Sequence, residues 1–261
     1  MDYEFIRFEV RENVAHVILD RPGALNAVNL EVNRDLARAA LQCASDRSIR
    51  AVLFRSEGKH FCAGGDIERF ISEGDRVSEY VTEAADAFHL AISRFARLDA
   101  PVLGAIQGLA VGGGMSIVAM LDLAIAAESA RFVCGYTRIG VTPDGALTYF
   151  LPRLVGRRRA LDLMLTNRPV SAREALEIGL VSRVVPDQDL QKAAEECAKE
   201  LASGPTRSFG VTKRLVLQSS EESLDTQMAL EGRELARAIT RPDGQAGIKA
   251  FKEGRLSKIS R

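Results

Sequence analysis

The 261-residue sequence contains no tryptophan, only four cysteines and only three histidines. The cysteines, at positions 43, 62, 134 and 197, form no CxxC pair, which argues against a zinc site and against a disulfide framework. The histidines, at positions 16, 60 and 89, have no metal-ligand spacing. We therefore expect no metal site, and free thiols in a reducing cytoplasm.

Charge of one sign and long apolar runs are missing as well. The 35 lysines and arginines balance the 35 aspartates and glutamates, so we expect no basic surface for nucleic acid or an anionic membrane. The most apolar stretch, residues 102–121, contains five glycines and is followed by Asp122, which argues against a membrane-spanning helix. The N-terminus, "MDYEFIRFEV", has neither the cationic start nor the apolar centre of a signal peptide. These absences favour a cytoplasmic protein.

The sequence does contain an alternation of strand and helix patterns. Short apolar runs predict strands at residues 14–19, 51–54 and 101–108. Apolar residues at helical spacing predict a helix at 29–43, capped by Asn29, and another at 78–98. A glycine turn, an apolar helix and two short strands follow the third strand.

From Gly156 to Gly254 the pattern is almost entirely helical. The whole succession predicts an α/β core of ββα-like units at residues 1–200 and a helical C-terminal region at 201–261.

Two stretches share one local design, an apolar strand followed by a turn of small residues and then a helix. They are "FCAGGDI" (61–67) and "AVGGGMS" (110–116). Glycine lets the backbone approach a ligand closely, and a helix start leaves N–H groups without partners. One N–H from each turn could form an oxyanion hole, which holds the charge that develops on a carbonyl oxygen. The alternatives are a phosphate site, although neither turn matches GxGxxG or GxxxxGK[ST], and close helix packing.

One carboxylate stands out in the apolar run "IGVTPDGALTYFLPRLVG" (139–156). Asp144 lies there between a proline and a glycine. Its side chain could cap a helix that begins near Gly145, or it could carry out chemistry.

These motifs occur together and in order with "LDRPGALNAV" (19–28), "PVLGAIQGLAVGGGMSIVAMLDLAIAAESARF" (101–132) and "AREALEIGLVSRVV" (172–185). The succession resembles the enoyl-CoA hydratase/isomerase family, also called the crotonase family, over nearly the whole chain. The resemblance implies a crotonase-like (ClpP/crotonase) spiral of ββα units with a helical C-terminal region. It also implies an acyl-CoA thioester as the substrate, with no separate cofactor.

The resemblance further implies roles for particular residues. The N–H groups of Gly65 and Gly113 would hold the thioester oxygen, and Tyr136 would contact the substrate. The backbone around Ala24, Ala63, Asp66 and Ile67 would line the path of the nucleotide. The family assembles as homotrimers or dimers of trimers through its C-terminal helices, and Phe251 in "IKAFKEGR" resembles an aromatic residue that reaches coenzyme A from a neighbouring subunit.

Hydratases of this family use two glutamates to hold one water molecule, and the matching positions here are Ser116 and Tyr136. We therefore expect little hydratase activity. Asp144 stands where several isomerases of the family, including those acting on enoyl-CoA and on ring-epoxidised aryl-CoA, place their acid/base, and the motifs resemble this isomerase group most. A base that moves a proton from Cα to Cγ needs one carboxylate in an apolar pocket, so we favour an isomerase.

Two alternatives remain open. His89, which could be an ordinary helical histidine, has the offset of the histidine base in the family's 4-chlorobenzoyl-CoA dehalogenases, in which an aspartate nucleophile stands at the position of Asp144. Against that reading, the dehalogenases have a tryptophan at the position of Tyr136 and an Asn-Asp turn. The second alternative is a non-catalytic acyl-CoA-binding paralogue. We expect the acyl group to be selected by a loop at residues 70–87.

Overall fold

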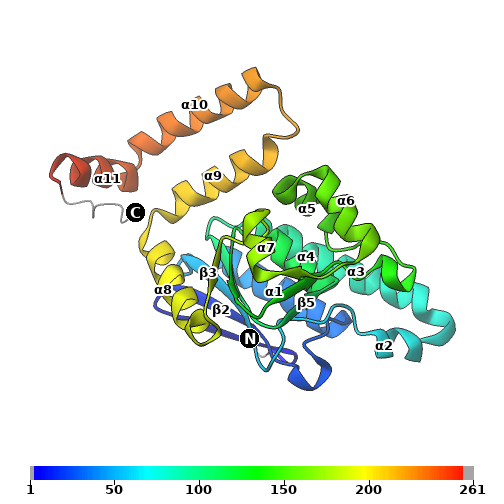
Figure 1. Ribbon diagram of the computed structural model, residues 1–261. Helices are drawn as coiled ribbons and strands as arrows, with labels where there is room; N and C mark the ends of the chain where they lie inside the picture. Colours follow the sequence, from blue (N-terminus) through cyan, green and yellow to red (C-terminus); the bar gives the residue numbers. More distant parts are fainter. Residues whose placement is uncertain (1–2, 255–261) are drawn as a thin grey trace.

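The structure of the chain, a computed structural model, describes residues 3–254 and consists of an α/β body with a long helical arm (Figure 1). Its strands are β1 Ile6–Arg11, β2 Val14–Leu19, β3 Ala51–Ser56, β4 Val102–Ile106, β5 Leu109–Val111, β6 Leu123–Ala127, β7 Arg131–Val133, β8 Val170–Ser171 and β9 Arg183–Val185. Its helices are α1 Leu30–Ser45, α2 Ile67–Ser72, α3 Val77–Ala96, α4 Gly113–Met120, α5 Leu147–Val155, α6 Arg157–Thr166, α7 Ala172–Glu177, α8 Leu190–Ser203, α9 Thr206–Gln218, α10 Leu224–Thr240 and α11 Pro242–Lys252.

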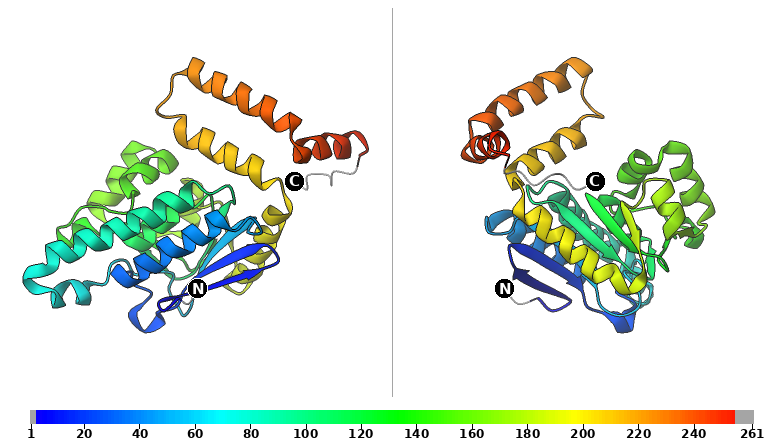
Figure 2. Two further views of the ribbon diagram at one scale, coloured as in Figure 1. Left: turned by 180° about the vertical axis from the view of Figure 1, so that it is seen from behind. Right: turned by 60° about the vertical axis from the view of Figure 1, so that its left-hand side comes forward.

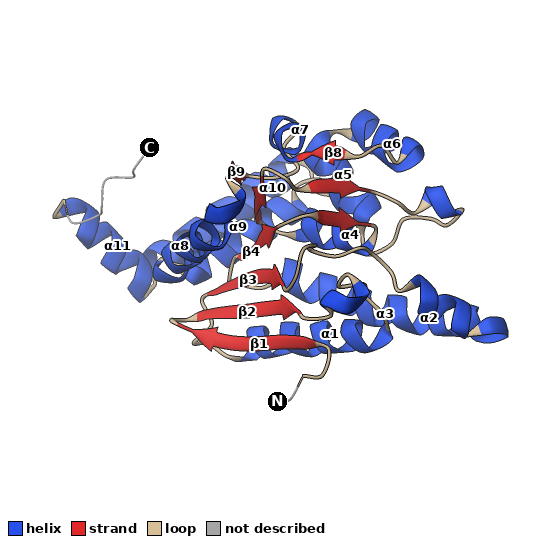
Figure 3. Ribbon diagram, turned by 60° about the horizontal axis from the view of Figure 1, so that its bottom comes forward, coloured by secondary structure: helices blue, strands red, loops and turns tan. Residues whose placement is uncertain are grey.

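The larger sheet has the strand order β1-β2-β3-β4-β6-β9, and β1 alone is antiparallel to its neighbour. Figure 3 shows β1 to β4 side by side in this order. All six residues of β2 are buried, as are five of the six in β3, which is typical of strands covered on both faces. Helix α8 covers one face with a stripe at helical spacing, formed by Leu190, Ala194, Ala198 and Ala202.

The smaller sheet, β5-β7-β8, gives the fold its repeating unit. A strand of the large sheet is followed by a short strand of the small sheet and then by a helix, as in β4-β5-α4 and β6-β7-α5. An isolated parallel bridge between Cys62 and Ala110 extends this arrangement back to the segment after β3. The α/β prediction of ββα units is therefore confirmed.

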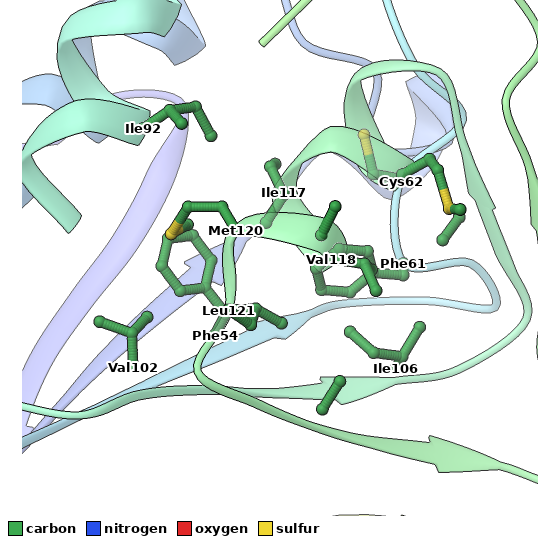
Figure 4. Close-up of a cluster of buried hydrophobic side chains, with 14 of the residues drawn as sticks. Phe54, Phe61, Cys62, Ile92, Val102, Ile106, Ile117, Val118, Met120 and Leu121 are labelled. Carbon is green, nitrogen blue, oxygen red and sulfur yellow. The ribbon is translucent and has the colours of Figure 1, made fainter. Parts of the chain in front are cut away.

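Helix α4 runs through the hydrophobic core, and all eight of its residues are buried. Figure 4 shows Ile117 and Val118 of this helix among Phe61, Ile106 and other apolar side chains. The start of α4 is fixed by this packing and cannot shift without opening the core.

Most predicted elements are confirmed, with two corrections. The helix predicted at 29–43 is α1, and its Asn29 cap accepts a hydrogen bond from the N–H of Val32 at 3.0 Å. The segment after Gly156 is less helical than expected, because β8 pairs with β7 and β9 forms an edge of the large sheet beside β6. The second correction concerns the loop named at residues 70–87, whose second half overlaps the helix predicted at 78–98. This segment belongs to α2, a 3-10 turn at Gly74–Arg76 and the first half of α3.

The arm α9–α11 extends away from the body (Figure 2). Helices α10 and α11 contain no buried residue, and Leu224, Leu235 and Phe251 are each more than 60 % exposed. The boundary expected at residue 200 falls inside α8, and the arm begins with α9 at Thr206. Within residues 3–254 no helix is long and apolar enough to cross a membrane.

A partly buried ion pair attaches α9 to the body. Lys213 Nζ lies 2.6 Å from Asp122 Oδ2 and also donates to the carbonyl of Ala100 at 3.2 Å, while the same Asp122 oxygen accepts the N–H of Val102 at 2.7 Å. Burial raises the pKa of Asp122 and lowers the pKa of Lys213, in each case against the effect of the partner's charge. The pair thus holds α9 in place at a desolvation cost.

We expect Lys213→Met alone to lower the free energy of unfolding by about 1–3 kcal/mol, because the partly buried Asp122 carboxylate would lose its cation. Asp122→Asn combined with Lys213→Met should recover most of that loss, since asparagine keeps an oxygen for the N–H of Val102. Urea unfolding of both variants measures the difference. Equal losses in the single and double variants would contradict this reading of the pair.

Candidate active site

The two glycine turns lie side by side because they follow neighbouring segments of the small sheet. The Cys62–Ala110 bridge is parallel, so both segments reach the same edge of the sheet and turn there. Gly64 and Gly112 have φ values of +101° and +51°, in the region that favours glycine. A Cβ on Gly64 would lie 3.1 Å from the carbonyl oxygen of Val111, and a Cβ on Gly112 would lie 3.5 Å from Gly64 Cα. The turns can approach this closely only because neither residue has a side chain.

The two N–H groups predicted to act together are left without acceptors. The N–H of Val28 donates to the carbonyl of Gly64 at 2.8 Å, and the carbonyl of Val28 accepts the N–H of Asp66 at 3.0 Å, which leaves the N–H of Gly65 unused. Gly113 is the first residue of α4, so its N–H has no intrahelical acceptor. Neither group has a hydrogen-bond acceptor among residues 3–254. Each can donate to a ligand, and the start of α4 adds a favourable dipole for negative charge.

The residues predicted to line the nucleotide path gather at the rim beside Gly65. Ala24 ends a 3-10 turn, and the carbonyl of the next residue, Leu25, accepts the N–H of Ala63 at 3.0 Å. The side chain of Ile67 is 44 % exposed. The backbone of these residues thus forms an accessible edge.

Asp66 has two contacts, one of which involves a residue that the sequence did not point to. Its carboxylate caps α2 by accepting the N–H of Arg69 at 3.2 Å, and its other oxygen lies 3.1 Å from Nη2 of Arg21. Arg21 also donates to the carbonyl of Ala27 at 2.7 Å. Arg21 therefore joins the 3-10 turn to the first glycine turn, a contact between distant residues that leaves no local sequence signal.

Asp144 does not cap a helix, so that interpretation of the sequence is wrong. Helix α5 begins at Leu147, and the N-cap position is Ala146, which makes no side-chain cap. Gly145 and Ala146 both have a φ near +60°, so the chain makes a tight turn before the helix. A Cβ on Gly145 would lie 2.3 Å from Cε1 of Phe88 and 2.9 Å from Cβ of Ser116, so only glycine fits.

The turn presents the Asp144 carboxylate to His89 of α3. Nε2 of His89 contacts Oδ1 of Asp144, and because an ionised carboxylate can only accept, the ring N–H is the donor. The two side chains are 52 % and 38 % exposed in the single chain. The fully apolar enclosure expected for Asp144 is therefore not found within residues 3–254, and the histidine is a direct partner.

Ser116 and Tyr136, which the resemblance matches to the two glutamates of hydratases, are hydrogen-bonded to each other. Their hydroxyl oxygens are 3.0 Å apart, and Ser116 Oγ donates to the carbonyl oxygen of Asp144 at 2.8 Å. Ser116 is completely buried, and burial raises the pKa of the Tyr136 phenol far above its usual range, so that hydroxyl stays protonated. The pair fixes the backbone of the Asp144 turn and offers no carboxylate to water.

Phe251 is the one predicted site residue that does not lie on the α/β body. It lies on α11 in the arm and is 74 % exposed. No group of three or more metal-ligating side chains is found in the part of the chain that the structure describes.

Comparison with known proteins gives consistent matches over nearly the full length. The sequence profile of the enoyl-CoA hydratase/isomerase family matches residues 9–259. The 1,2-epoxyphenylacetyl-CoA isomerase of Escherichia coli strain K12 is 35 % identical over 95 % of each chain. A 4-chlorobenzoyl coenzyme A dehalogenase of an Arthrobacter species is 32 % identical over 98 % of this chain and 94 % of that protein. The crystal structure of an enoyl-CoA hydratase from Mycobacterium smegmatis superposes with a TM-score of 0.90 at 30 % identity, over 98 % of both chains.

The hydroxyl pair behind Asp144 can be tested by two single changes. Ser116→Ala should lower the free energy of unfolding by about 1–3 kcal/mol, because the Asp144 carbonyl and the Tyr136 hydroxyl would lose their closer partner and keep only the 3.4 Å bond to each other. Tyr136→Phe should cost only about 0.5–1.5 kcal/mol, since the Ser116–Asp144 bond remains. Chemical denaturation of the two variants measures both costs. A larger cost for Tyr136→Phe than for Ser116→Ala would show that serine is not the central member of the network.

Proposed function

The chain belongs to the enoyl-CoA hydratase/isomerase family, whose members act on acyl-CoA thioesters, and we propose that it is an isomerase working through a thioester enolate. The reaction moves a double bond, or rearranges a ring, next to the thioester carbonyl. Asp144 is the acid/base, and the N–H groups of Gly65 and Gly113 form the oxyanion hole.

The proposed steps balance with one carboxylate. Asp144 removes a proton from Cα of a β,γ-unsaturated thioester, and the electron pair moves onto the thioester oxygen. The two backbone N–H groups hold the resulting dienolate oxygen. Asp144 then returns the proton to Cγ, the double bond settles between Cα and Cβ, and no group leaves.

The observation that carries the proposal is the hydrogen bond between Ser116 and Tyr136 behind Asp144. The pair occupies the two positions at which a hydratase would hold and activate its water. Because both hydroxyls are neutral and hydrogen-bonded, Asp144 is the carboxylate that we assign to the proton transfer. One base suits proton transfer within a substrate better than the addition of water.

Substrate binding in this proposal uses the rim residues and the arm. The backbone at Ala24, Ala63, Asp66 and Ile67 accompanies the nucleotide, and Tyr136 closes the inner side of the acyl site. Homotrimers or dimers of trimers would bring the exposed Phe251 of one subunit to the coenzyme A of another. The epoxide isomerase among the relatives supports the choice of an isomerase.

The contact between His89 and Asp144 favours a second candidate, aryl-CoA dehalogenation. In that reaction Asp144 attacks the ring carbon that carries the halogen, and halide leaves with its electron pair. His89 then takes a proton from water, which attacks the aryl ester and releases the hydroxyaryl thioester together with the carboxylate. A third outcome, binding without turnover, would indicate a non-catalytic paralogue.

A turnover screen with 3-enoyl-, 2-enoyl-, aryl-epoxide- and halobenzoyl-CoA thioesters separates these functions, and the variants His89→Gln and Asp144→Asn assign the roles. We expect isomerisation, very slow hydration of crotonyl-CoA and no halide release. Asp144→Asn should abolish turnover. His89→Gln should leave isomerisation within about tenfold, since general-base catalysis worth about 10²–10⁴ remains with Asp144.

Isotope labelling provides the control for this screen. Only a nucleophilic Asp144 takes up ¹⁸O from labelled water over many turnovers, because ester hydrolysis places solvent oxygen in the carboxylate. We expect no label in the peptide that contains Asp144. Halide release together with ¹⁸O in Asp144 would replace the isomerase with the dehalogenase.

A further inference from the structure

A cavity of about 300 Å³ lies between α3, α5 and α9, immediately beside His89. Ligand pockets for small molecules begin at about this size and are mostly apolar with a few polar groups. The apolar part of the wall is formed by Ile92, Ala96, Ala146, Tyr149, Phe150 and Leu217. The cavity lies further along α3 than residues 70–87, the segment that the sequence suggested for substrate selection.

Helix α9 forms one wall of the cavity, which is open to solvent on one side, and this helix is held at two points. Near its middle the Lys213–Asp122 pair attaches it to the body. Towards its end the Tyr149 hydroxyl donates to the carbonyl of Leu217 at 3.3 Å, and Arg153 of α5 donates to Ser220 just beyond the helix. The wall formed by α9 is therefore anchored to α5 and does not depend on apolar contact alone.

The cavity extends along α3 from the His89–Asp144 pair. His89, Ile92, Ala96 and Arg97 recur at helical spacing and line one side of it, so the wall is about 12 Å long at 1.5 Å per residue. The reacting carbons of a substrate would lie at the Asp144 end, and the rest of the acyl group would extend towards Arg97.

The charges around the cavity are balanced. His89 is paired with Asp144 at one end, and Arg97 and Glu221 both line the cavity beyond it. The Arg97 guanidinium already donates to the carbonyl and the hydroxyl of Ser93. Because Arg97 and Glu221 supply one charge of each sign at this solvent-exposed end, a carboxylate at the end of the acyl group would gain no net attraction there, and the apolar walls favour an uncharged group.

We propose that this cavity binds the distal part of the acyl group, and that the substrate is the thioester of an uncharged medium-chain or aryl-substituted acid. The proposal rests on the proposed function, because it takes the thioester to be oriented with its Cα at Asp144. It assigns chain-length selection to Ala96 on α3 and Leu217 on α9. Short acyl groups would bind without entering the cavity.

Equilibrium binding of saturated thioesters tests the cavity without any turnover. Isothermal titration of the full chain would use butyryl-CoA, octanoyl-CoA and the ω-carboxylated analogue of octanoyl-CoA. Each methylene group that enters the cavity should tighten binding by about fourfold, so octanoyl-CoA should bind far more tightly than butyryl-CoA. The ω-carboxylated analogue should bind at least about tenfold more weakly than octanoyl-CoA.

Two variants and one control test whether the residues that line the cavity determine the affinity for octanoyl-CoA. Ala96→Phe fills the cavity and should weaken octanoyl-CoA binding by at least about tenfold while butyryl-CoA changes by less than about twofold. Leu217→Ala, on the half-exposed wall from α9, should weaken octanoyl-CoA by about tenfold even if Ala96→Phe fails to fold. Leu90→Phe places the same ring on an exposed part of α3 outside the cavity and should change neither affinity.

The outcomes separate this proposal from the proposed function. If octanoyl-CoA and butyryl-CoA bind equally, or if both variants leave octanoyl-CoA binding unchanged, the cavity is not the acyl site, whatever the turnover screen gives. Tighter binding of the ω-carboxylated analogue would overturn the assignment of an uncharged acyl group. Chain-length-dependent binding with no isomerisation would retain the cavity and remove the isomerase.

Discussion

The parallel bridge between Cys62 and Ala110 is the contact on which the site depends. It brings a turn that follows β3 and a turn that follows β5 to the same edge of the small sheet, with Gly64 against Gly112. Helix α4 cannot retreat from this contact, because all of its residues are packed into the core. Two backbone donors are thereby held ready by buried structure, and no side chain has to be ordered when a ligand arrives.

Around that frame, two neutral hydroxyls stand at the positions where the family resemblance places the glutamates of hydratases. Ser116 and Tyr136 form a hydroxyl pair that holds the backbone of the Asp144 turn. The two hydroxyls hydrogen-bond to the backbone carbonyl of Asp144. His89 then contacts the carboxylate from α3, and the same helix continues along the wall of the cavity. In this account, one side of α3 would contact the catalytic carboxylate through His89 and would also line the cavity that selects the acyl group.

Much of the frame could be predicted from sequence because its signals are local. An apolar pattern at helical spacing after Asn29 predicted α1, and glycines between an apolar strand and a helix predicted both turns. The strand β9 was missed because "RVV" is short and surrounded by helical patterns, and it is a strand only because β6 offers an edge. The capping interpretation of Asp144 failed because Gly145 and Ala146 take left-handed conformations and delay the helix until Leu147. The Arg21–Asp66 and His89–Asp144 contacts join residues 45 and 55 positions apart, and no single stretch of sequence encodes them.

The central claim is that a thioester enolate forms against the N–H of Gly113, and exchange of the Cα proton tests it most directly. In ²H₂O the enzyme would be incubated with a 3-enoyl-CoA, and deuterium at Cα and Cγ would be followed by NMR for Gly113→Ala and Gly113→Pro. Both variants add a Cβ, which would lie 3.1 Å from Cγ2 of Val28, but only proline lacks the N–H. We predict that Gly113→Ala still exchanges and isomerises, and that folded Gly113→Pro loses at least about a hundredfold in both rates. Equal rates in the two variants would contradict the oxyanion hole and with it the account of this site.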